Sequence, residues 1–394
     1  MKIVFFDFIH RYGGGPQLAA DTMVRLSQQY EVEVVDPYGQ SNPYIDKLRK
    51  GGVKVHVLMP KSQFIFLGSP GNSLKRFWRL FRSLPHYLKL RRRLVKTIRE
   101  INPDIIWTNT KPGFRFLSLC SSLQDIPMTM EIIGCQPASY YDDSVGRKMK
   151  QRLSVVMSIS TETANQLKKA GFDPDKIHVV YDTIDFDETI RQSRQPLESP
   201  LPHIEKRPAM LVPATLITKK GQVTAIKSLS RLKESGMDPI LWLAGDTVGP
   251  DKSYEVLLKD LAEQLDLTEN VAFLGWRSDV PAIMKQVDMV ILPTHEEGFG
   301  HVILEAMLLK RPVLGTPVGG IKDSIIDDYN GLLFPINDDV KLAKQVLRIN
   351  SDVELSHRLI QNGYKTVTEK FTPQAHTKQC MEALEKVFQN KTPS

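Results

Sequence analysis

Short apolar runs alternate with stretches of helical periodicity along the whole chain. Short apolar runs separated by helical segments are typical of buried parallel strands joined by helices, so the pattern predicts an α/β fold. In the first half the predicted strands are 2–8, 30–36, 53–59, 104–109, 128–133, 155–160 and 177–182. In the second half they are 209–215, 239–245, 270–275, 289–294, 312–316 and 331–335.

A segment rich in proline, serine and charge separates the two series of strands. It spans 191–208 and reads RQSRQPLESPLPHIEKRP, a composition typical of a linker between domains. We therefore predict parallel-sheet domains at 1–190 and 209–370, followed by a helix near 373–389 within the C-terminal segment 371–394. Ligands bind such domains at the carboxyl ends of the strands, so the candidate sites lie in strand-to-helix loops.

The composition of the 394 residues is that of a water-exposed globular protein, with 41% hydrophobic and 25% charged residues. No apolar stretch is long enough to span a bilayer, and the opening MKIVFFDF is too short for the apolar region of a signal peptide. The three cysteines are scattered, which predicts neither a disulfide framework nor a zinc site. We expect a cytoplasmic protein.

The basic residues are concentrated in the first half. Residues 1–190 hold 27 Lys and Arg against 19 Asp and Glu, whereas 191–394 hold 25 against 26. Ten basic residues fall between 75 and 99, and we expect Pro85 to divide this segment into two helices. Aromatic residues among the charges at 73–82 favour peripheral contact of 73–99 with an anionic membrane. An acidic acceptor and simple solubility stay open, and no nucleic-acid reading module is present.

Two glycine-containing loops are candidates for anion binding. Gly14 and Gly15 follow the first predicted strand and precede a helix, where backbone can approach a phosphate closely. Lys219 and Lys220 stand immediately before Gly221 and a second helical run, where lysine can meet a diphosphate as a compact charge. Each loop taken alone is equally compatible with an ordinary turn or a solvated pair of charges.

The stretch PTHEEGFGHVILEAMLLKRPVLGTPVGG, 293–320, carries the densest chemistry of the chain. A glycine-rich turn after a predicted strand starts a helix near His301, so amides of the first turn can hold an anion. Glu297 lies on the turn and Glu305 about one helical turn inside. A purely structural interpretation is that both carboxylates interact favourably with the helix dipole. The co-occurrence of the turn, both carboxylates and a second glycine pair at 319–320 favours a binding site instead.

This stretch resembles the E-x7-E signature of the family 4 retaining glycosyltransferases, which have the GT-B fold of two Rossmann-like domains facing across a cleft. LAGD (243–246), VAFLGW (271–276), TPVGGIKDSI (316–325) and NGLLFP (330–335) agree with the same family. The resemblance covers essentially the whole second half and is looser in the first. It implies that the first domain binds the acceptor, that the second binds a nucleotide sugar, and that the C-terminal helix returns to the first domain.

The implied reaction is a metal-independent transfer of a sugar from a UDP-, GDP- or ADP-sugar to a glycan or lipid-linked acceptor, at or near the inner face of the membrane and without a cofactor. Glu297 and Lys220 would be the catalytic residues, Glu297 acting by positioning and charge. The implied donor-binding residues are Gly14, Gly15, Lys219, Lys220, Glu297, Gly298, Phe299, Gly300 and Glu305. His10 is a candidate acceptor contact, with a structural role equally open.

The chain departs from the family pattern at two positions. Thr215 stands where the family usually has an arginine five residues before the lysine, and Ile133 stands where it often has a histidine. These departures favour an alternative, a non-catalytic nucleotide-sugar-binding partner of another glycosyltransferase. A sugar-nucleotide epimerase would need acid and base carboxylates facing the sugar C2, and we find no such pair. The DxD triplet at 185–187 lies in no nucleotide-binding context, so we expect no metal site there.

Overall fold

The computed structural model describes residues 1–9, 14–60, 73–202 and 207–389, and only the backbone of 14, 73–82 and 389. These residues form two compact units. Unit 1 comprises 1–158, 164–180 and the segment from 377 onward, and unit 2 comprises 159–163 and 181–376. The predicted linker, 191–208, belongs to unit 2 by this division. His10 lies outside the described residues.

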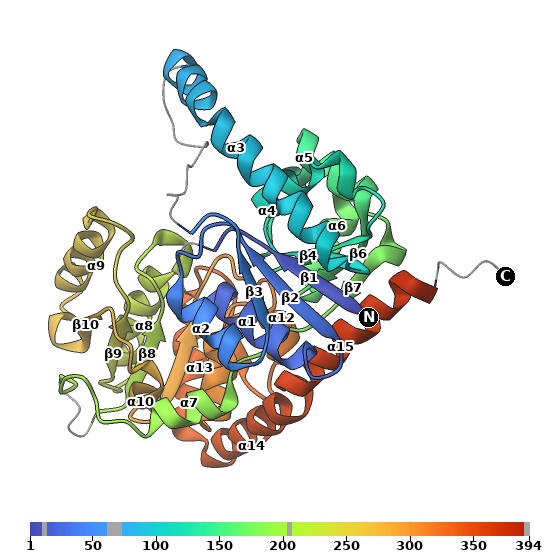
Figure 1. Cartoon of the computed structure of the whole chain (residues 1–394). Coiled ribbons are helices and arrows are strands. Elements are labelled where there is room, and N and C mark those ends of the chain that lie inside the picture. The colour runs from blue at the N-terminus through green and yellow to red at the C-terminus, as the bar shows by residue number, and fades with distance from the viewer. Residues whose placement is uncertain (10–13, 61–72, 203–206, 390–394) are drawn as a thin grey trace. The chain divides into compact units, whose positions relative to one another are not determined.

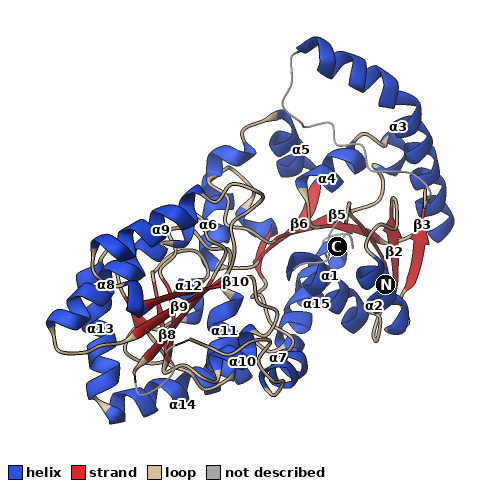
Figure 2. Ribbon diagram, turned by 90° about the vertical axis from the view of Figure 1, so that its left-hand side faces the viewer, coloured by secondary structure: helices blue, strands red, loops and turns tan. Residues whose placement is uncertain are grey.

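Unit 1 contains a parallel sheet of seven described strands in the order β3-β2-β1-β4-β5-β6-β7. The strands are β1 (Lys2–Phe6), β2 (Glu31–Asp36), β3 (Lys54–Val57), β4 (Ile105–Thr108), β5 (Met128–Ile132), β6 (Leu153–Ser158) and β7 (Ile177–Val179). The helices are α1 (Gly14–Leu26), α2 (Asn42–Lys50), α3 (Ser73–Ile101), α4 (Lys111–Ser118), α5 (Ser144–Arg152), α6 (Thr161–Lys169) and α15 (Pro373–Gln389). Figure 2 shows helices on both faces of the sheet, which accounts for the apolar residues that predominate in its central strands.

The C-terminal helix α15 packs on the sheet of unit 1, as the resemblance implied. Its residues Cys380 and Leu384 are fully buried in one apolar cluster with Ile3 and Phe5 of β1. Arg25 of α1 donates to the hydroxyl of Thr377 at 2.8 Å. Figure 1 shows this helix, in red, running beside the blue elements of the N-terminus.

Helix α3 corrects one expectation, because it continues through Pro85 as a single helix. Its C-terminal half is anchored in the core by fully buried Leu90, Leu94 and Ile98, at the spacing of one helix face. These core contacts stabilise the helix, so that it continues although Pro85 cannot donate a backbone hydrogen bond. The side chains of 73–82, on which the membrane expectation depends, lie outside the description.

Unit 2 contains a parallel sheet of six described strands in the order β10-β9-β8-β11-β12-β13. The strands are β8 (Ala209–Pro213), β9 (Ile240–Ala244), β10 (Val271–Gly275), β11 (Met289–Leu292), β12 (Val313–Gly315) and β13 (Leu332–Leu333). The helices are α7 (Phe186–Ser193), α8 (Gln222–Glu234), α9 (Ser253–Gln264), α10 (Val280–Met284), α11 (His301–Leu308), α12 (Ile321–Ser324), α13 (Asp339–Ser351) and α14 (Val353–Lys370). Two Rossmann-like parallel-sheet units confirm the predicted fold class.

The strand order of unit 2 reverses between β8 and β11. The chain leaves β8 toward β9 and β10 and then returns to the other side of β8 with β11. At such a switch point the loops after the two central strands diverge and leave room for a ligand at the carboxyl edge of the sheet. The loops that follow β8 and β11 carry the lysines and glutamates singled out above.

Candidate functional site

The loop after β8 is tied to the loop after β11 by hydrogen bonds to one carbonyl. The Lys219 carbonyl accepts from the His295 amide at 2.7 Å and from the Thr294 hydroxyl at 2.9 Å. Gly221 follows at φ +69°, and a Cβ there would lie 1.9 Å from the Pro293 carbonyl oxygen. Only glycine therefore permits the close approach that brings the two loops together.

Two lysine–glutamate pairs join these loops and differ in burial. Lys220 Nζ lies 2.6 Å from Glu297 Oε2, with 23% and 17% of the two side chains exposed. Lys219 Nζ lies 2.5 Å from Glu296 Oε2, and both side chains are more than 60% exposed. The first pair is thus held in a site of low solvent access, whereas the second is an ordinary surface pair.

The turn Glu297–Gly300, which we call the EGFG turn, starts helix α11. Gly300 has φ +86° as the residue before the helix, and no side chain among the described residues caps the first amides. The Gly298 amide donates to Glu297 Oε1 at 3.1 Å, which orients that carboxylate over the turn. Uncapped amides at a helix start next to a lysine suit a negatively charged ligand.

The loop after β12 supports the EGFG turn from behind. The Gly320 amide donates to the Gly298 carbonyl at 2.9 Å. A Cβ on Gly319, whose φ is +49°, would lie 1.8 Å from the Glu297 carbonyl oxygen. Asp323, in helix α12, accepts the Thr161 amide at 2.8 Å and is bound by the hydroxyl of the same residue. The glycine pair therefore shapes the turn, and Asp323 serves a structural contact.

Phe299 contributes its backbone to the turn and its side chain to the core. The ring is 2% exposed and lies between Phe371 and Tyr181, with ring centroids 5.4 and 6.2 Å away. This packing fixes the turn against the segments that begin and end unit 2.

His301, the first residue of α11, forms a pair with Asp182 that the sequence did not indicate. His301 Nε2 lies 2.6 Å from Asp182 Oδ2, and the exposed fractions of the two side chains are 33% and 5%. Burial acts to lower the pKa of His301, but the charge and hydrogen bond of Asp182 outweigh it and raise that pKa to about 9. In return His301 outweighs the effect of burial on Asp182 and holds the pKa of that carboxyl below its usual range. A cationic imidazolium therefore stands at the start of α11.

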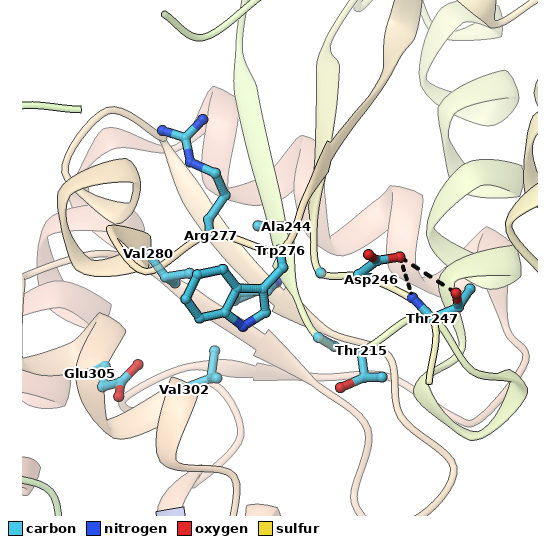
Figure 3. Close-up of a pocket in the computed structure, with 12 residues that line it drawn as sticks. Thr215, Ala244, Asp246, Thr247, Trp276, Arg277, Val280, Val302 and Glu305 are labelled. Carbon is cyan, nitrogen blue, oxygen red and sulfur yellow. Dashed lines mark hydrogen bonds between the residues drawn. The ribbon is translucent and has the colours of Figure 1, made fainter. Parts of the chain in front are cut away.

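Glu305, in helix α11, lines a pocket of about 420 Å³. Burial raises the pKa of Glu305, and the charge of His301 opposes that rise. Val302 and Glu305 supply one wall, and the loops after β8, β9 and β10 supply the rest (Figure 3). The twelve lining residues are Pro213, Ala214, Thr215, Ala244, Gly245, Asp246, Thr247, Trp276, Arg277, Val280, Val302 and Glu305.

Family models match most of the chain in two consecutive blocks. Residues 44–188 match the model of Glycosyltransferase Family 4, and residues 193–366 match that of Glycosyl transferases group 1. The chain belongs to the family 4 glycosyltransferases. The boundary between the two matched blocks falls at the start of the predicted linker.

Relatives and solved structures agree with this membership. LpsE of Rhizobium meliloti (strain 1021), a lipopolysaccharide core biosynthesis glycosyltransferase, is 29% identical over 45% of this chain and 49% of its own. LpsD of the same organism, another such enzyme, is 23% identical over 75% of this chain and 78% of its own. The match spans half or less of each of the first three curated relatives. HepE of Anabaena, solved with UDP, superposes with a TM-score of 0.78 at 21% identity over 98% of this chain and 100% of HepE, which shows the GT-B fold.

Within unit 2 of this family 4 glycosyltransferase, the predicted donor residues form one cluster. Lys219, Lys220, Glu297–Gly300 and Glu305 all border the loops after β8 and β11. Gly14 and Gly15 belong to unit 1, at the start of α1, and their role stays a prediction. The arrangement can hold an anion beside Lys220 and a polar ligand group beside Glu305.

The two departures from the family pattern have distinct settings. Thr215 lines the pocket, and its carbonyl accepts from Gln222 at 2.9 Å. Ile133 lies beside Gly15 of unit 1, with its Cδ1 2.9 Å from where a Cβ of that glycine would stand. Glu131, two residues earlier, is fully buried and accepts from Asn109 at 3.1 Å, so it does not take the place of the missing histidine.

The remaining features considered from the sequence are the DxD triplet, metal sites and membrane-spanning segments. Asp185 of the DxD triplet caps α7 by accepting the Glu188 amide at 3.0 Å. The described residues contain no cluster of three or more His, Cys, Asp and Glu side chains arranged for a metal ion. In the described part of the chain, no helix has the length and apolarity to cross a membrane.

Proposed function

We propose that this chain is a retaining glycosyltransferase that moves a sugar from a nucleotide-diphosphate sugar to a glycan or lipid-linked acceptor in cell-surface polysaccharide or glycoconjugate synthesis. The observation that carries the proposal is the half-buried Lys220–Glu297 pair, 2.6 Å apart, at the uncapped start of α11. Family membership and the names of relatives in lipopolysaccharide core synthesis support the same reaction class.

In the proposed complex each part of the donor meets a matching group. Lys220 and the amides of the EGFG turn face the diphosphate, where a cation and oriented dipoles stabilise the charge that develops as the nucleotide leaves. Glu305 accepts hydrogen bonds from the ribose hydroxyls, and Glu297 holds the sugar. These roles are supported by the pairing of Lys220 with Glu297 at the start of α11 and by Glu305, which lines the pocket from the same helix.

The proposed reaction breaks the bond between the anomeric carbon and the diphosphate oxygen and forms a bond to an acceptor hydroxyl on the same face of the sugar. The acceptor proton passes to the departing phosphate oxygen, so no protein nucleophile is needed. Lys220 supplies the positive charge that assists departure, and the reaction is therefore proposed to run without a metal. Full activity after exhaustive chelation with EDTA is the expected result, and loss restored by a divalent ion would refute this part.

UDP is the nucleotide we place first. HepE, whose structures hold UDP and UDP-glucose, has the same fold over 98% of this chain. The cation set differs from the family pattern, because Thr215 replaces an arginine and Lys219 is engaged by Glu296 on the surface. His301 is also cationic, but its charge is paired with Asp182 at 2.6 Å.

Thr215 is also the observation that favours the second candidate, a non-catalytic nucleotide-sugar-binding partner. Such a protein would bind the donor through the same pocket and release no nucleotide. The half-buried Lys220–Glu297 pair supports the catalytic proposal, since binding alone does not require a cation paired with a carboxylate over the turn.

We propose that the protein binds an anionic membrane through α3 and meets its acceptor there. Leu84 and Leu88 are 51% and 44% exposed, and Lys89 and Arg92 are exposed on the same helix. Exposed leucines beside basic residues suit insertion at a charged lipid surface. Co-sedimentation with phosphatidylglycerol vesicles but not with phosphatidylcholine vesicles is expected. Equal recovery with both would remove the membrane from the proposal.

Calorimetric titration of the whole chain with UDP, GDP and ADP tests the binding half of the proposal. One nucleotide should bind, and at about 100 times its dissociation constant it should stabilise the protein by roughly 2.7 kcal/mol, visible as a rise in melting temperature. Absence of binding with all three would refute both candidate functions.

A further inference from the structure

Trp276 is placed unlike the other described tryptophans. Trp107 and Trp242 are fully buried, whereas Trp276 is 72% exposed. Within the described part of the chain, its indole has no hydrogen-bonding partner and no aromatic neighbour. The indole therefore presents a large planar apolar face that a flat ligand can stack on.

The backbone that carries Trp276 is held firmly on both sides. Gly275 precedes it at φ +67° and forms a bridge with Gly245 at the end of β9. Arg277 follows it, and its guanidinium is bound by Asp279 at 2.6 and 2.7 Å. The indole is therefore presented by a fixed frame, while the neighbouring guanidinium is directed elsewhere (Figure 3).

The pocket beside the indole lacks other groups free to hold a flat ring. Trp276 is the only aromatic residue among the twelve that line it. Asp246, at the same rim, is already bound by Lys252 and by the Thr247 amide, the latter at 2.7 Å. Arg277 is likewise occupied by its pair with Asp279. The two charged side chains nearest the indole are thus unavailable to a ligand.

The order of groups along the pocket suggests which part of a ligand reaches Trp276. In a nucleotide the ribose joins the phosphates at one end and the base at the other. With the diphosphate at Lys220 and the ribose at Glu305, the base extends along the pocket toward the loops after β9 and β10. Those loops are the ones that carry Asp246 and Trp276.

We propose that Trp276 is the stacking platform for the nucleobase, and that this stacking, more than hydrogen bonds from charged side chains, holds the base. This inference rests on the proposed nucleotide-sugar function and adds a residue to it. An indole face pairs well with any planar heteroaromatic base, and removal of such a platform typically lowers affinity about 10- to 100-fold.

Titration with UDP, followed by calorimetry and by tryptophan fluorescence, tests the proposal. In the wild type, stacking should quench the Trp276 emission with the same dissociation constant that calorimetry gives. Trp276→Ala should bind UDP about 10- to 100-fold more weakly. Trp276→Phe should keep the affinity within several-fold and lose the quench. Val248→Ala, at a residue of the same rim that is 73% exposed and does not line the pocket, should bind as the wild type.

The outcomes separate this inference from the function on which it rests. UDP binding that is unchanged in Trp276→Ala, or a quench that persists in Trp276→Phe, would overturn the platform and leave the nucleotide site standing. Such a result would favour a protein contact for the exposed indole. Failure of UDP, GDP and ADP to bind the wild type would overturn the proposed function and this inference together. If Trp276→Ala fails to fold, the quench in Trp276→Phe still decides.

Discussion

The pair between His301 and Asp182 permits a quantitative prediction. His301→Gln keeps a hydrogen-bond donor beside Asp182 but removes the titrating charge. Asp182 is 3% exposed, so it depends strongly on its partner. Glu305 and Glu297 also raise the His301 pKa, and His376 helps to keep Asp182 ionised. The charged imidazole should therefore stabilise unit 2 and the start of α11.

The sign and size follow from the pKa of about 9, which is higher than the ordinary value of 6.5. A raised pKa means that the folded state holds the proton more tightly, so the stabilisation is complete below pH 6.5 and is lost as the pH rises through 9. This difference in the His301 pKa corresponds to about 3 kcal/mol in the free energy of unfolding. Because a third of the side chain is exposed, screening by solvent reduces the expected effect to about 1–2 kcal/mol.

The assay has two parts: a direct measurement of the His301 pKa and a measurement of stability against pH. Proton NMR of the imidazole signal that disappears in His301→Gln should give a pKa near 9. Urea unfolding at pH 6, 8 and 10 should show the stability difference between wild type and His301→Gln shrinking by about 1–2 kcal/mol over that range. Subtraction of the variant removes the titration of other groups common to both proteins. Titration of His301 near pH 6.5, or a difference that stays constant with pH, would refute the reasoning.

Three further substitutions, two of them with a matched control variant, test the site. Glu305→Ala should weaken UDP binding about 10- to 100-fold in calorimetry, because a charged hydrogen-bond acceptor for the ribose is lost; unchanged affinity would exclude that role. Lys220→Ala should lower kcat/KM for transfer about 10²- to 10³-fold, whereas Lys219→Ala, from an exposed pair, should change it only a few-fold; equal losses would contradict the assignment. Gly319→Ala places a Cβ 1.8 Å from a carbonyl of the EGFG turn and should cost about 3 kcal/mol in urea unfolding. Gly236→Ala, at similar positive φ with nothing within 4 Å, should cost only about 1 kcal/mol; equal costs would show that the close approach is unimportant.

The apolar pattern was sufficient to predict the thirteen described strands of the two sheets, but their ends were predicted too long at the site. The run 209–215 yields a strand only to Pro213, and 289–294 yields one only to Leu292. The residues that follow, Ala214 and Thr215 in one loop and Pro293 and Thr294 in the other, leave the sheet to form the pocket and the loop contacts. Periodicity detects burial, and residues such as Thr294 are buried without pairing in a strand.

Pro85 shows the opposite error. A proline predicts a break because it removes a backbone donor, but α3 continues through it. The core contacts of Leu90, Leu94 and Ile98 hold the following turns of the helix, and their combined effect cannot be read from the proline alone.

The proximity of the candidate site residues was predictable where they are close in sequence. Glu297, the following glycines and Glu305 lie within nine residues, and Lys220 was found through its own glycine loop. The partner of His301 lies 119 residues away, in a segment with no signal for it, so only the fold could bring Asp182 to the start of α11. Trp276 belongs to the VAFLGW stretch that agrees with the family, and its exposure is evident only from the structure.

The most direct test of the central claim is the release of nucleotide from a UDP-sugar panel by the whole chain, with the anomer of the released sugar followed by proton NMR. The account predicts slow turnover of at least one UDP-sugar with retained anomeric configuration. Glu297→Gln should still bind UDP, but it should liberate UDP from the UDP-sugar about 10²- to 10³-fold more slowly than the wild type. Tight binding of a UDP-sugar with no release, alone or with lipid-linked glycan extract added, would contradict catalysis and favour the non-catalytic partner.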